Sequence, residues 1–397
     1  MKNSNIQWIG TIPDSWQLDR LQWHLDEINE SNNPVKTQQV LSLTNKLGVI
    51  PYEEKGEQGN KSKENIDEYK LAYPDTIVAN SMNILIGSVG KCKYFGCVSP
   101  VYYVFKPKSG ENIDFLNYVF QLTQFQKELR KYANGILEIR LRVSSNDILK
   151  RQIAFPSTEG QQRIVSLLDE KLTGIDRLIE IENQQIEKLK EYKQAVITEA
   201  VTKGLDKSAP MKDSGVEWIG EIPENWSTCR IKNVATISNG KEIEVDGGNI
   251  PVYGSGGIFK YTDKPLFSGI SLLLGRKGTI DKPMLVSGDF WTVDTMFYTS
   301  SIRQIVPKYL FYCAKSLICF DFFKSGSVLP SMTQTELNDV YITYPNTCIQ
   351  TEIADYLDKK CSEIDTLAKI KQKKIDMLNE YKKSLIYEYV TGKKEVV

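Results

Sequence analysis

The chain carries the same framework twice, and this internal repeat constrains the fold more than any other feature. Residues 1–16 (MKNSNIQWIGTIPDSW) return without a gap as residues 211–226 (MKDSGVEWIGEIPENW), an offset of 210. Further along, residues 85–90 (LIGSVG) match residues 273–278 (LLGRKG) at an offset of 188. The sequence therefore predicts two modules of one architecture that fill the chain.

Later matches keep nearly this second offset. At 189 they pair Pro156 with Pro345, residues 175–176 with 364–365, and residues 191–193 with 380–382. The fall from 210 places the extra residues of the first copy before Leu85, in a stretch that includes residues 29–67 and is rich in Asn, Lys, Glu, Gly and Ser. A retained framework with altered loops is typical of modules with different ligands. A plain duplication with drifting surface loops is the alternative.

The first part of each copy combines short apolar runs with helical stretches. Residues 76–90 and 98–107 are apolar or aromatic and bounded by Gly and Pro, which indicates strands. Residues 115–132 have a helical pattern, so we predict an α/β or α+β fold for this part. A capping box then marks a helix start in each copy, formed by Ser144 with Asp147 and by Thr333 with Glu336.

The second part of each copy is a long helix with a row of mostly apolar residues, here called the seam, in steps of three and four. The first seam consists of Ile164, Leu168, Leu172, Ile175, Ile179, Ile186, Leu189, Tyr192 and Val196. The second consists of Ile353, Leu357, Cys361, Ile364, Ala368, Ile375, Leu378, Tyr381 and Leu385. Gly204 and Gly392 lie where C-terminal caps are expected. Two seams of matching length predict a coiled coil, unless each helix packs only on its own globular domain.

The chain lacks the residue groupings of common catalytic sites. Its one histidine, His24, disfavours a histidine-rich metal site and a Ser-His-Asp triad. Cys92 and Cys97 lack zinc-finger spacing, and the glycines of residues 87–91 lack Walker spacing. Asp75 follows Pro74 as in some nucleases, but no acidic residue stands between Thr76 and Gly110 to share a metal with it. We therefore predict no catalytic residue, no metal site and a binding or organising role.

Composition limits where such a chain can work. Fifty Lys and Arg residues balance fifty Asp and Glu residues, so a DNA partner would be bound by local patches. Seven scattered cysteines fit buried positions in a reducing compartment. No run approaches the ~18 apolar residues of a membrane span. We expect a cytoplasmic protein without membrane contact.

The motifs resemble specificity subunits of type I restriction-modification systems. The resemblance lies in the WIGTIPDSW and WIGEIPENW openings and in GQQRIVSLLDEKLTGID after Pro156 and IQTEIADYLDKKCSEID after Pro345. It covers essentially the whole chain. One departure lies in residues 347–350, which lack the usual Glu-Gln pair that the first copy echoes as Gln161-Gln162.

This resemblance implies a non-catalytic DNA-binding subunit. Its two target-recognition domains would each read one half of an interrupted, asymmetric site on double-stranded DNA. An antiparallel pair of long helices with pseudo-twofold symmetry would set the spacer and bind two methyltransferase subunits, and motor-nuclease subunits could join. S-adenosylmethionine is then expected in the methyltransferase subunits, with no cofactor in this chain. In such a pair the equivalent residues Glu182 and Lys371 should lie close together.

The predicted organisation has five segments. They are a first target-recognition domain (residues 1–158), a central helical spacer (159–203), a linker with the start of the second repeat (204–217), a second target-recognition domain (218–345) and a C-terminal helical spacer (346–397).

Candidate DNA contacts lie beside the glycine turn and before the capped helix of each copy. In the first copy they are Lys91, Lys93, Tyr94, Asn134, Arg140, Arg142 and Ser144. In the second they are Arg276, Lys277, Thr279, Ser325, Ser327, Ser331 and Thr333. Lys and Arg hold phosphates or guanine edges, and small polar residues near a helix N-terminus suit phosphate. A solvated surface position is the alternative for each.

Two other classes of function stay open at this point. A duplicated coiled-coil scaffold that binds protein is the alternative to a DNA-specificity subunit. A stand-alone nuclease or methyltransferase is opposed by the missing motifs.

Overall fold

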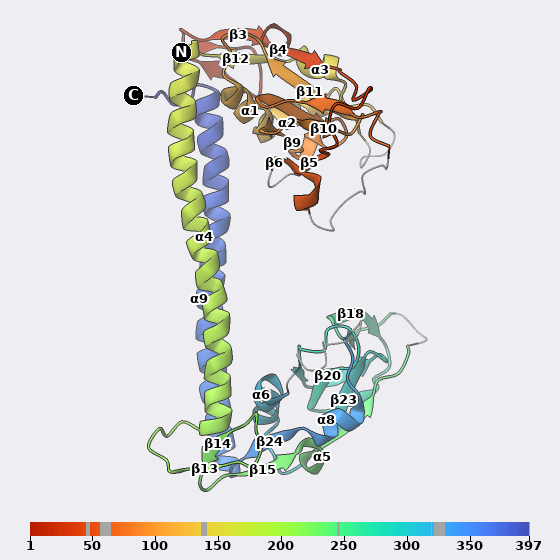
Figure 1. Cartoon of the computed structure of the whole chain (residues 1–397). Coiled ribbons are helices and arrows are strands. Elements are labelled where there is room, and N and C mark those ends of the chain that lie inside the picture. Colours follow the sequence, from red (N-terminus) through yellow and green to blue (C-terminus); the bar gives the residue numbers. More distant parts are fainter. Residues whose placement is uncertain are drawn as a thin grey trace. The chain divides into compact units, whose positions relative to one another are not determined.

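The chain is described from a computed structural model, which covers residues 1–44, 48–55, 65–135, 141–243, 247–318, 320 and 330–396. Contacts between residues divide it into two compact units. Unit 1 comprises Met1–Ile181 and Lys374–Val397, and unit 2 comprises Glu182–Lys373. Each unit includes about half of two long helices, α4 (Thr158–Lys203) and α9 (Thr347–Val390), which run side by side (Figure 1). No described helix has the length and apolar character needed to cross a membrane.

The central sheet of unit 1 is antiparallel, with strand order β4-β11-β8-β9. Its strands are β4 (Leu25–Ile28), β8 (Thr76–Asn80), β9 (Val89–Cys92) and β11 (Tyr102–Pro107). The amphipathic helices α1 (Ile113–Gln121) and α2 (Thr123–Arg130) belong to the same core, in which Ile77, Phe105 and Phe120 are fully buried. This core extends to both long helices, because it also contains Leu168 and Leu385.

Short elements complete unit 1 around this sheet. The paired strands are β1 (Lys2–Asn3) with β2 (Thr11–Ile12), and β3 (Gln17–Arg20) with β12 (Gln152–Phe155). The short helices are η1 (Leu21–Trp23), η2 (Tyr52–Lys55), η3 (Ile84–Ile86) and α3 (Ser145–Leu149).

Unit 2 repeats the same strand order as β16-β23-β20-β21. The strands are β16 (Ala235–Asn239), β20 (Ser271–Gly275), β21 (Met284–Val286) and β23 (Met296–Ile302), and α6 (Pro307–Leu317) contributes to their core. The flanking elements are β13 (Met211–Asp213), β14 (Glu221–Pro223), β15 (Ser227–Arg230), α5 (Ile231–Val234), α8 (Gln334–Asp339) and β24 (Tyr341–Tyr344). The paired strands β13-β14 and β15-β24 correspond to β1-β2 and β3-β12.

The strand registers correct the predicted alignment of the two copies. Corresponding rows of paired residues are Ile28–Val104–Val78 in unit 1 and Ser238–Tyr298–Leu273 in unit 2. β8 therefore corresponds to β20, and the match between residues 85–90 and 273–278 is wrong. The first segment lies after β8, whereas the second contains the end of β20 itself. Similar apolar-glycine runs occur at both places, but only strand pairing shows which positions are equivalent.

A second layer of strands differs more between the units. In unit 1 a hairpin of β5 (Leu41–Thr44) and β6 (Gly48–Pro51) is joined by one parallel bridge to the pair β10 (Gly96–Val98) and β7 (Lys70–Ala72). In unit 2 the corresponding strands form one sheet, β18-β17-β22-β19. Its strands are β17 (Ile250–Gly254), β18 (Gly257–Thr262), β19 (Phe267–Ser268) and β22 (Asp289–Thr292). The hairpins β5–β6 and β17–β18 thus hold the same place in the topology.

The long helices are antiparallel and are connected by ion pairs that repeat under exchange of the two copies. In unit 1 Lys382 binds Asp176, and in unit 2 the equivalent residue Lys193 binds Asp365 at 2.7 Å. Near the middle of both helices, Lys371 Nζ lies 3.1 Å from Glu182 Oε2. The prediction that these two equivalent residues lie close together is confirmed.

Each long helix ends at a glycine that packs on the opening motif of a copy. Gly392 has φ +70° and lies against Pro13 and Trp16, and Gly204 has φ +74° and lies against Pro223 and Trp226. An L residue disfavours this left-handed conformation, so glycine suits both C-terminal caps. The paired helix ends and openings explain why the WIG-IP-W motif occurs twice.

Several local expectations differ from the structure. The predicted helix over residues 115–132 is broken at Leu122 into α1 and α2, and the predicted strand over residues 76–90 includes a turn and η3. The seam residues Tyr192 and Tyr381 are 51% and 52% exposed, because two successive steps of three residues (186–189–192 and 375–378–381) turn them away from the partner helix. Cys348 is exposed and Cys229 half-buried, whereas the other described cysteines are buried.

Candidate nucleic-acid interface

The short helix that precedes the last strand of each unit begins at a capped hydroxyl residue. In unit 1 Ser144 Oγ accepts a hydrogen bond from the Asp147 amide at 3.0 Å and donates one to its carboxylate at 2.6 Å. In unit 2 Thr333 Oγ1 accepts from the Glu336 amide at 3.2 Å, and the Glu336 carboxylate accepts from the Thr333 amide at 2.6 Å. The predicted capping box is complete in unit 2, and in unit 1 the acidic side chain binds the hydroxyl instead of the backbone.

The segment before each cap is bonded to the end of a central strand. The Val143 amide donates to the Ser81 carbonyl at 3.2 Å, and the Met332 amide donates to the Arg276 carbonyl at 2.9 Å. Ser81 follows β8 and Arg276 follows β20, so these are equivalent positions. The predicted contact Arg276 therefore corresponds to Ser81, not to a residue beside Lys91. Met82, which follows Ser81, is the counterpart of Lys277. It was not predicted as a DNA contact, because the assumed match paired residues 85–90 with residues 273–278.

In unit 1 the structure brings Asn134, Arg142 and Ser144 into one exposed segment. Asn134 and Arg142 exchange backbone hydrogen bonds of 2.8 and 2.9 Å, and the Arg142 guanidinium lies 3.7 Å from Met82 Sδ. Arg140, also predicted here, lies outside the described residues. A charged group held beside a strand end can reach phosphate or a base edge. DNA contact by Asn134, Arg142 and Ser144 stays a prediction, and the three residues share one location.

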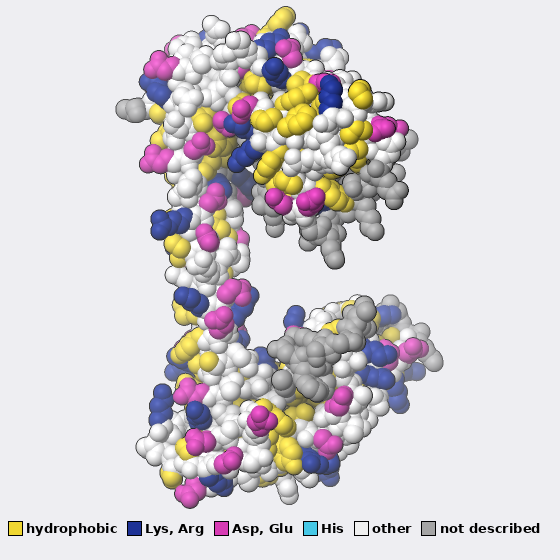
Figure 2. Space-filling view, viewed as in Figure 1, with side chains coloured by type: hydrophobic (Ala, Val, Ile, Leu, Met, Phe, Trp, Pro, Cys, Tyr) yellow, Lys and Arg dark blue, Asp and Glu magenta, His cyan; other side chains and the backbone are white. Residues whose placement is uncertain are grey.

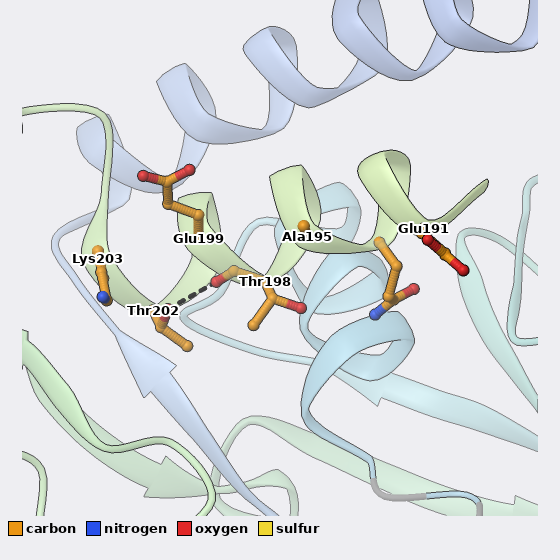
Figure 3. Close-up of a pocket in the computed structure, with 7 residues that line it drawn as sticks. Glu191, Ala195, Thr198, Glu199, Thr202 and Lys203 are labelled. Carbon is orange, nitrogen blue, oxygen red and sulfur yellow. Dashed lines mark hydrogen bonds between the residues drawn. The ribbon is translucent and has the colours of Figure 1, made fainter. Parts of the chain in front are cut away.

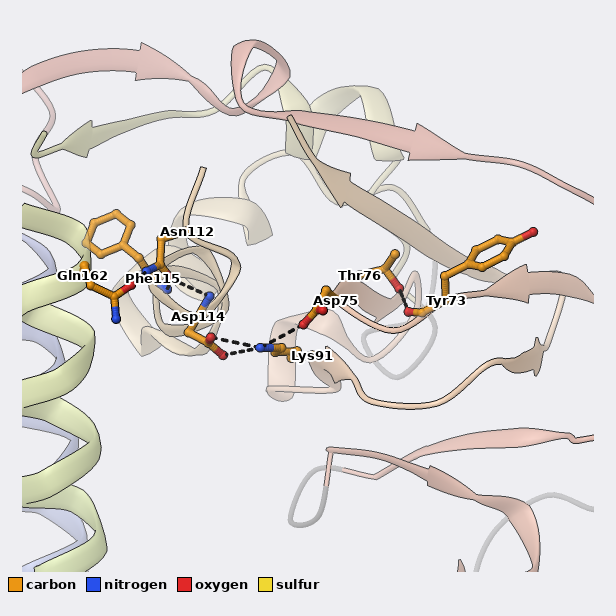
Figure 4. Close-up of polar contacts among 8 residues, drawn as sticks. All are labelled: Tyr73, Asp75, Thr76, Lys91, Asn112, Asp114, Phe115 and Gln162. Carbon is orange, nitrogen blue, oxygen red and sulfur yellow. Dashed lines mark hydrogen bonds and ion pairs between the residues drawn. The ribbon is translucent and has the colours of Figure 1, made fainter. Parts of the chain in front are cut away.

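Lys91 is held differently from a free phosphate-binding lysine (Figure 4). Its ammonium lies 2.9 Å from Asp114 Oδ2 and 3.1 Å from Asp75 Oδ1. Burial lowers the pKa of Lys91, but its hydrogen bonds to Asp114 and Asp75 outweigh burial and the net direction is upward. Asp114 stands in the first turn of α1, whose N-cap Asn112 bonds Gln162 of α4 at 2.8 Å. This geometry favours a structural role that connects β9 to α1.

The same cluster revises the sequence argument about Asp75. No acidic residue stands between Thr76 and Gly110, yet the fold brings Asp114 to the other side of Lys91. The lysine forms an ion pair with each carboxylate, and the described residues contain no group of three metal-ligating side chains. The arrangement is an ionic cross-link and gives no support to a nuclease site.

The other two predicted residues of this region lie on the turn between β9 and β10. Lys93 is exposed, while Tyr94 is half-buried against the cluster formed by β5, β6 and the central sheet. The described contacts of Lys93 and Tyr94 do not include Asn134, Arg142 or Ser144.

In unit 2 the structure connects the segment of Arg276 and Lys277 with that of Ser331 and Thr333. Lys277 is exposed and forms an isolated bridge with Ser331, two residues before the cap Thr333. Arg276 is half-buried, and its guanidinium donates to the Asp294 carbonyl at 3.2 Å. Thr279 is half-buried after the turn. Ser325 and Ser327 lie outside the described residues.

The visible surface carries mixed charges and no single basic face (Figure 2). One open hollow of about 680 Å³ lies along the end of α4 and is lined by Glu191, Gln194, Ala195, Thr198, Glu199, Thr202 and Lys203 (Figure 3). The Thr202 hydroxyl donates there to the Thr198 carbonyl at 2.7 Å. The hollow is open and is lined by acidic (Glu191, Glu199) and basic (Lys203) side chains. It does not resemble an enclosed substrate site.

Equivalent buried glutamines hold each unit to its long helix. Gln161 Oε1 accepts from the Asn112 amide at 3.2 Å, and Gln350 Oε1 accepts from the Val306 amide at 2.8 Å. Gln350 also donates to the Pro345 carbonyl at 2.8 Å. Gln350 thus does in the second copy what Gln161 does in the first, despite the missing Glu-Gln pair at residues 347–350.

A tyrosine–aspartate contact repeats beside each glutamine. Tyr118 donates to Asp169 at 2.5 Å, and Tyr312 donates to Asp358 at 2.7 Å. Burial and the hydrogen bond to the carboxylate raise the pKa of both tyrosines. These contacts fix the orientation of α1 and α6 against the long helices.

Comparison with known proteins agrees with the duplicated architecture. The family model described as "Type I restriction modification DNA specificity domain" matches twice, over residues 23–191 and 223–393. The chain belongs to this family. Two relatives from Methanocaldococcus jannaschii are the type I restriction enzyme MjaVIII specificity subunit, 26% identical over 70% of this chain and 69% of the relative, and the putative MjaX specificity subunit, 22% identical over 97% and 95%.

Solved structures of specificity subunits share the fold. A chain from a study of complex assembly and conformational transition of the type I R-M system has a TM-score of 0.73 and 13% identity, over 96% of this chain and 98% of that chain. The HsdS subunit from Thermoanaerobacter tengcongensis has a TM-score of 0.53 and 12% identity, over 99% and 100%. The predicted fold, two similar domains with a pair of long antiparallel helices, is confirmed.

Proposed function

We propose that each unit reads one half of a bipartite, asymmetric site on double-stranded DNA. The observation that carries this proposal is the repeat of the specificity domain, with an equivalent capped segment at the end of β8 and of β20. The framework is the same in both units, while the second-layer strands and the residues after β8 and β20 differ. Two similar readers with unequal contact residues suit two unequal half-sites.

The long helices are proposed to set the distance between the half-sites. α4 has 46 residues and α9 has 44, which corresponds to about 69 and 66 Å at ~1.5 Å per residue. One turn of DNA is about 34 Å long. The partly buried pair Glu182–Lys371 and the repeated outer ion pairs support one register of the two helices.

The helices are also proposed to bind two methyltransferase subunits, which would carry S-adenosylmethionine and the chemistry, while motor-nuclease subunits could join. Both helices expose large apolar side chains at equivalent places. These residues are Leu178, Ile181 and Tyr192 on α4, and Leu367, Ile370 and Tyr381 on α9. A second apolar row beside a seam favours packing by further helices. The chain itself is proposed to be non-catalytic and cytoplasmic.

The test is a matched insertion of one helical turn. Four residues inserted after Glu182 and four after Lys371 lengthen each helix by ~6 Å, close to two base-pair steps. Methylation-site sequencing of a host with the protein and its partners should then find both half-sites unchanged and a longer spacer. The single insertion after Glu182 is the control and should disrupt the seam. Altered half-sites, or activity with an unaltered spacer, would contradict the proposal.

A salt series separates this function from a protein-binding scaffold. Binding of random duplex DNA should weaken steeply as salt rises, because phosphate contacts release counterions. Binding that is absent at low salt would favour the scaffold.

A further inference from the structure

The β17–β18 hairpin of unit 2 exposes a group of large apolar side chains. Ile258, Phe259 and Tyr261 on β18 are 49%, 55% and 49% exposed. In the equivalent hairpin of unit 1, by contrast, Leu41, Leu43 and Val49 are buried in one cluster. A contiguous exposed apolar group on one element indicates a contact surface more than a packing accident does.

A β-bulge directs the side chain of Phe259. Val252 pairs with Lys260 and Tyr253 pairs with Ile258, so Phe259 is the extra residue of β18 without a partner on β17. Such bulges bend a strand and change the direction of one side chain. The ring lies over Gly254, where a Cβ atom would stand 3.3 Å from Phe259 Cδ1 and Cε1. The glycine therefore allows the ring to lie along the outer face of the hairpin.

The hairpin turn touches the predicted DNA-contact group of unit 2. Ser255, between β17 and β18, lies 3.3 Å from the position of a Cβ atom on Gly278. Gly278 follows Lys277 directly, and Lys277 bridges to Ser331. The exposed hairpin and the polar group are thus neighbours, although they are far apart in sequence.

Cations flank the apolar group. Lys260 Nζ lies 5.9 Å from the centroid of the Phe259 ring. Lys264, just after β18, and Lys277, beside the hairpin turn, are both exposed. Figure 2 shows Lys and Arg side chains on the edge of unit 2 where Figure 1 places β18. Lysines beside an exposed apolar group suit a DNA partner, because its phosphates are bound by Lys and Arg side chains.

We propose that the β17–β18 hairpin enters the major groove and that Phe259 contacts the C5 methyl group of a thymine in one half-site. A two-stranded β-ribbon fits the major groove, and apolar side chains there distinguish thymine by its methyl group. The exposed Lys264 and Lys277 then hold the flanking phosphates. This inference rests on the proposed function and names a specificity-determining residue for it.

The first experiment replaces Phe259 with alanine in the full complex with its partner subunits. Methylation-site sequencing should show relaxed selection at one thymine position of one half-site, with about a tenfold loss of discrimination against other bases, and the other half-site unchanged. Ile270→Ala is the matched control, because Ile270 is an equally exposed apolar residue of unit 2 outside the hairpin. It should leave both half-sites unchanged.

The second experiment removes the methyl group from the DNA. Duplexes in which deoxyuridine replaces that thymidine should bind the wild-type complex about fourfold more weakly, which corresponds to ~0.8 kcal/mol for one buried methyl group. The Phe259→Ala complex should bind both duplexes equally. The inference would be overturned if Phe259→Ala left the methylated sequences unchanged, or if both complexes lost the same affinity on removal of the methyl group. In either case a bipartite site recognised by the wild-type complex would still support the proposed function. A wild-type complex that selects no bipartite site would overturn the proposed function itself.

Discussion

The two hairpins that share one topological place differ in what covers them. The β5–β6 hairpin of unit 1 folds onto β9, and Leu41 lies directly over Gly96, where an added Cβ atom would be 2.7 Å from Leu41 Cγ. The β17–β18 hairpin of unit 2 joins a continuous sheet and leaves Phe259 at the surface. With the same strand order, the apolar side chains of one hairpin are buried in the core and those of the other are exposed at the surface. A shared topology does not give the two units the same exposed surface.

Truncation of the two hairpins should have the most unequal effects. Leu41→Ala should destabilise unit 1 by about 3 kcal/mol, because it opens a cavity in a closed cluster. Phe259→Ala should change the free energy of unfolding of unit 2 by less than about 0.5 kcal/mol, as is usual for exposed positions. Hydrogen exchange in a urea series, followed separately for the residues of each unit, measures both free energies of unfolding. Equal losses would show that the two hairpins are packed alike.

The ion pairs of the helices allow a second comparison, between their middle and their ends. Lys371→Ala removes the cation that lies 3.1 Å from the carboxylate of Glu182, whose side chain is 7% exposed, and should cost about 2–3 kcal/mol. Lys193→Ala and Lys382→Ala remove pairs with largely exposed aspartates and should each cost about 0.5 kcal/mol. Thermal unfolding of the three variants checks this order. A larger loss for either outer lysine would contradict it.

The two helix-capping glycines should respond in the same order as their contacts. A Cβ atom on Gly392 would stand 2.4 Å from Pro13 Cδ, and one on Gly204 would stand 3.0 Å from Trp226 Cζ2. Both substitutions to alanine carry the strain of a positive φ, about 1 kcal/mol. Gly392→Ala should cost about 2 kcal/mol and Gly204→Ala about 1 kcal/mol. Denaturant midpoints of both variants would reveal a reversed order.

The smallest expected effect is a difference in acid sensitivity. Burial raises the pKa of Asp358, but hydrogen bonds from Lys308 and Tyr312 outweigh it and the net direction is downward from 3.8. Asp358 therefore stabilises unit 2 above pH 3.8, and this contribution is lost as the pH falls through the lowered pKa. Lys308 and Asp358 are partly exposed, so the effect should be a few tenths of a kcal/mol.

Asp358→Asn should make the acid side of the stability profile of unit 2 less steep. The matched variant in unit 1 is Asp169→Asn, since the described contacts give Asp169 the tyrosine Tyr118 but no lysine. An identical acid profile for wild type and Asp358→Asn would refute the assigned role of Lys308.

Features that depend on neighbours along the chain could be predicted from the sequence alone. The duplicated opening, the capped helix starts at Ser144 and Thr333, the two long helices and their terminal glycines all follow from short motifs and from periodicity. The equivalence of Glu182 and Lys371 could be predicted because one offset continues without interruption through both helices. The family resemblance rests on these same local motifs.

Which strands and contacts correspond in the two units is clear only from the strand pairing of the folded chain. The similar runs at residues 85–90 and 273–278 suggested a false equivalence, because pairing between β8 and β11 or β20 and β23 depends on residues far apart in sequence. Lys91 looked like a free cation until the fold brought Asp114 beside it. Phe259 carried no signal at all, since its exposure results from a bulge on one strand and a glycine on the next.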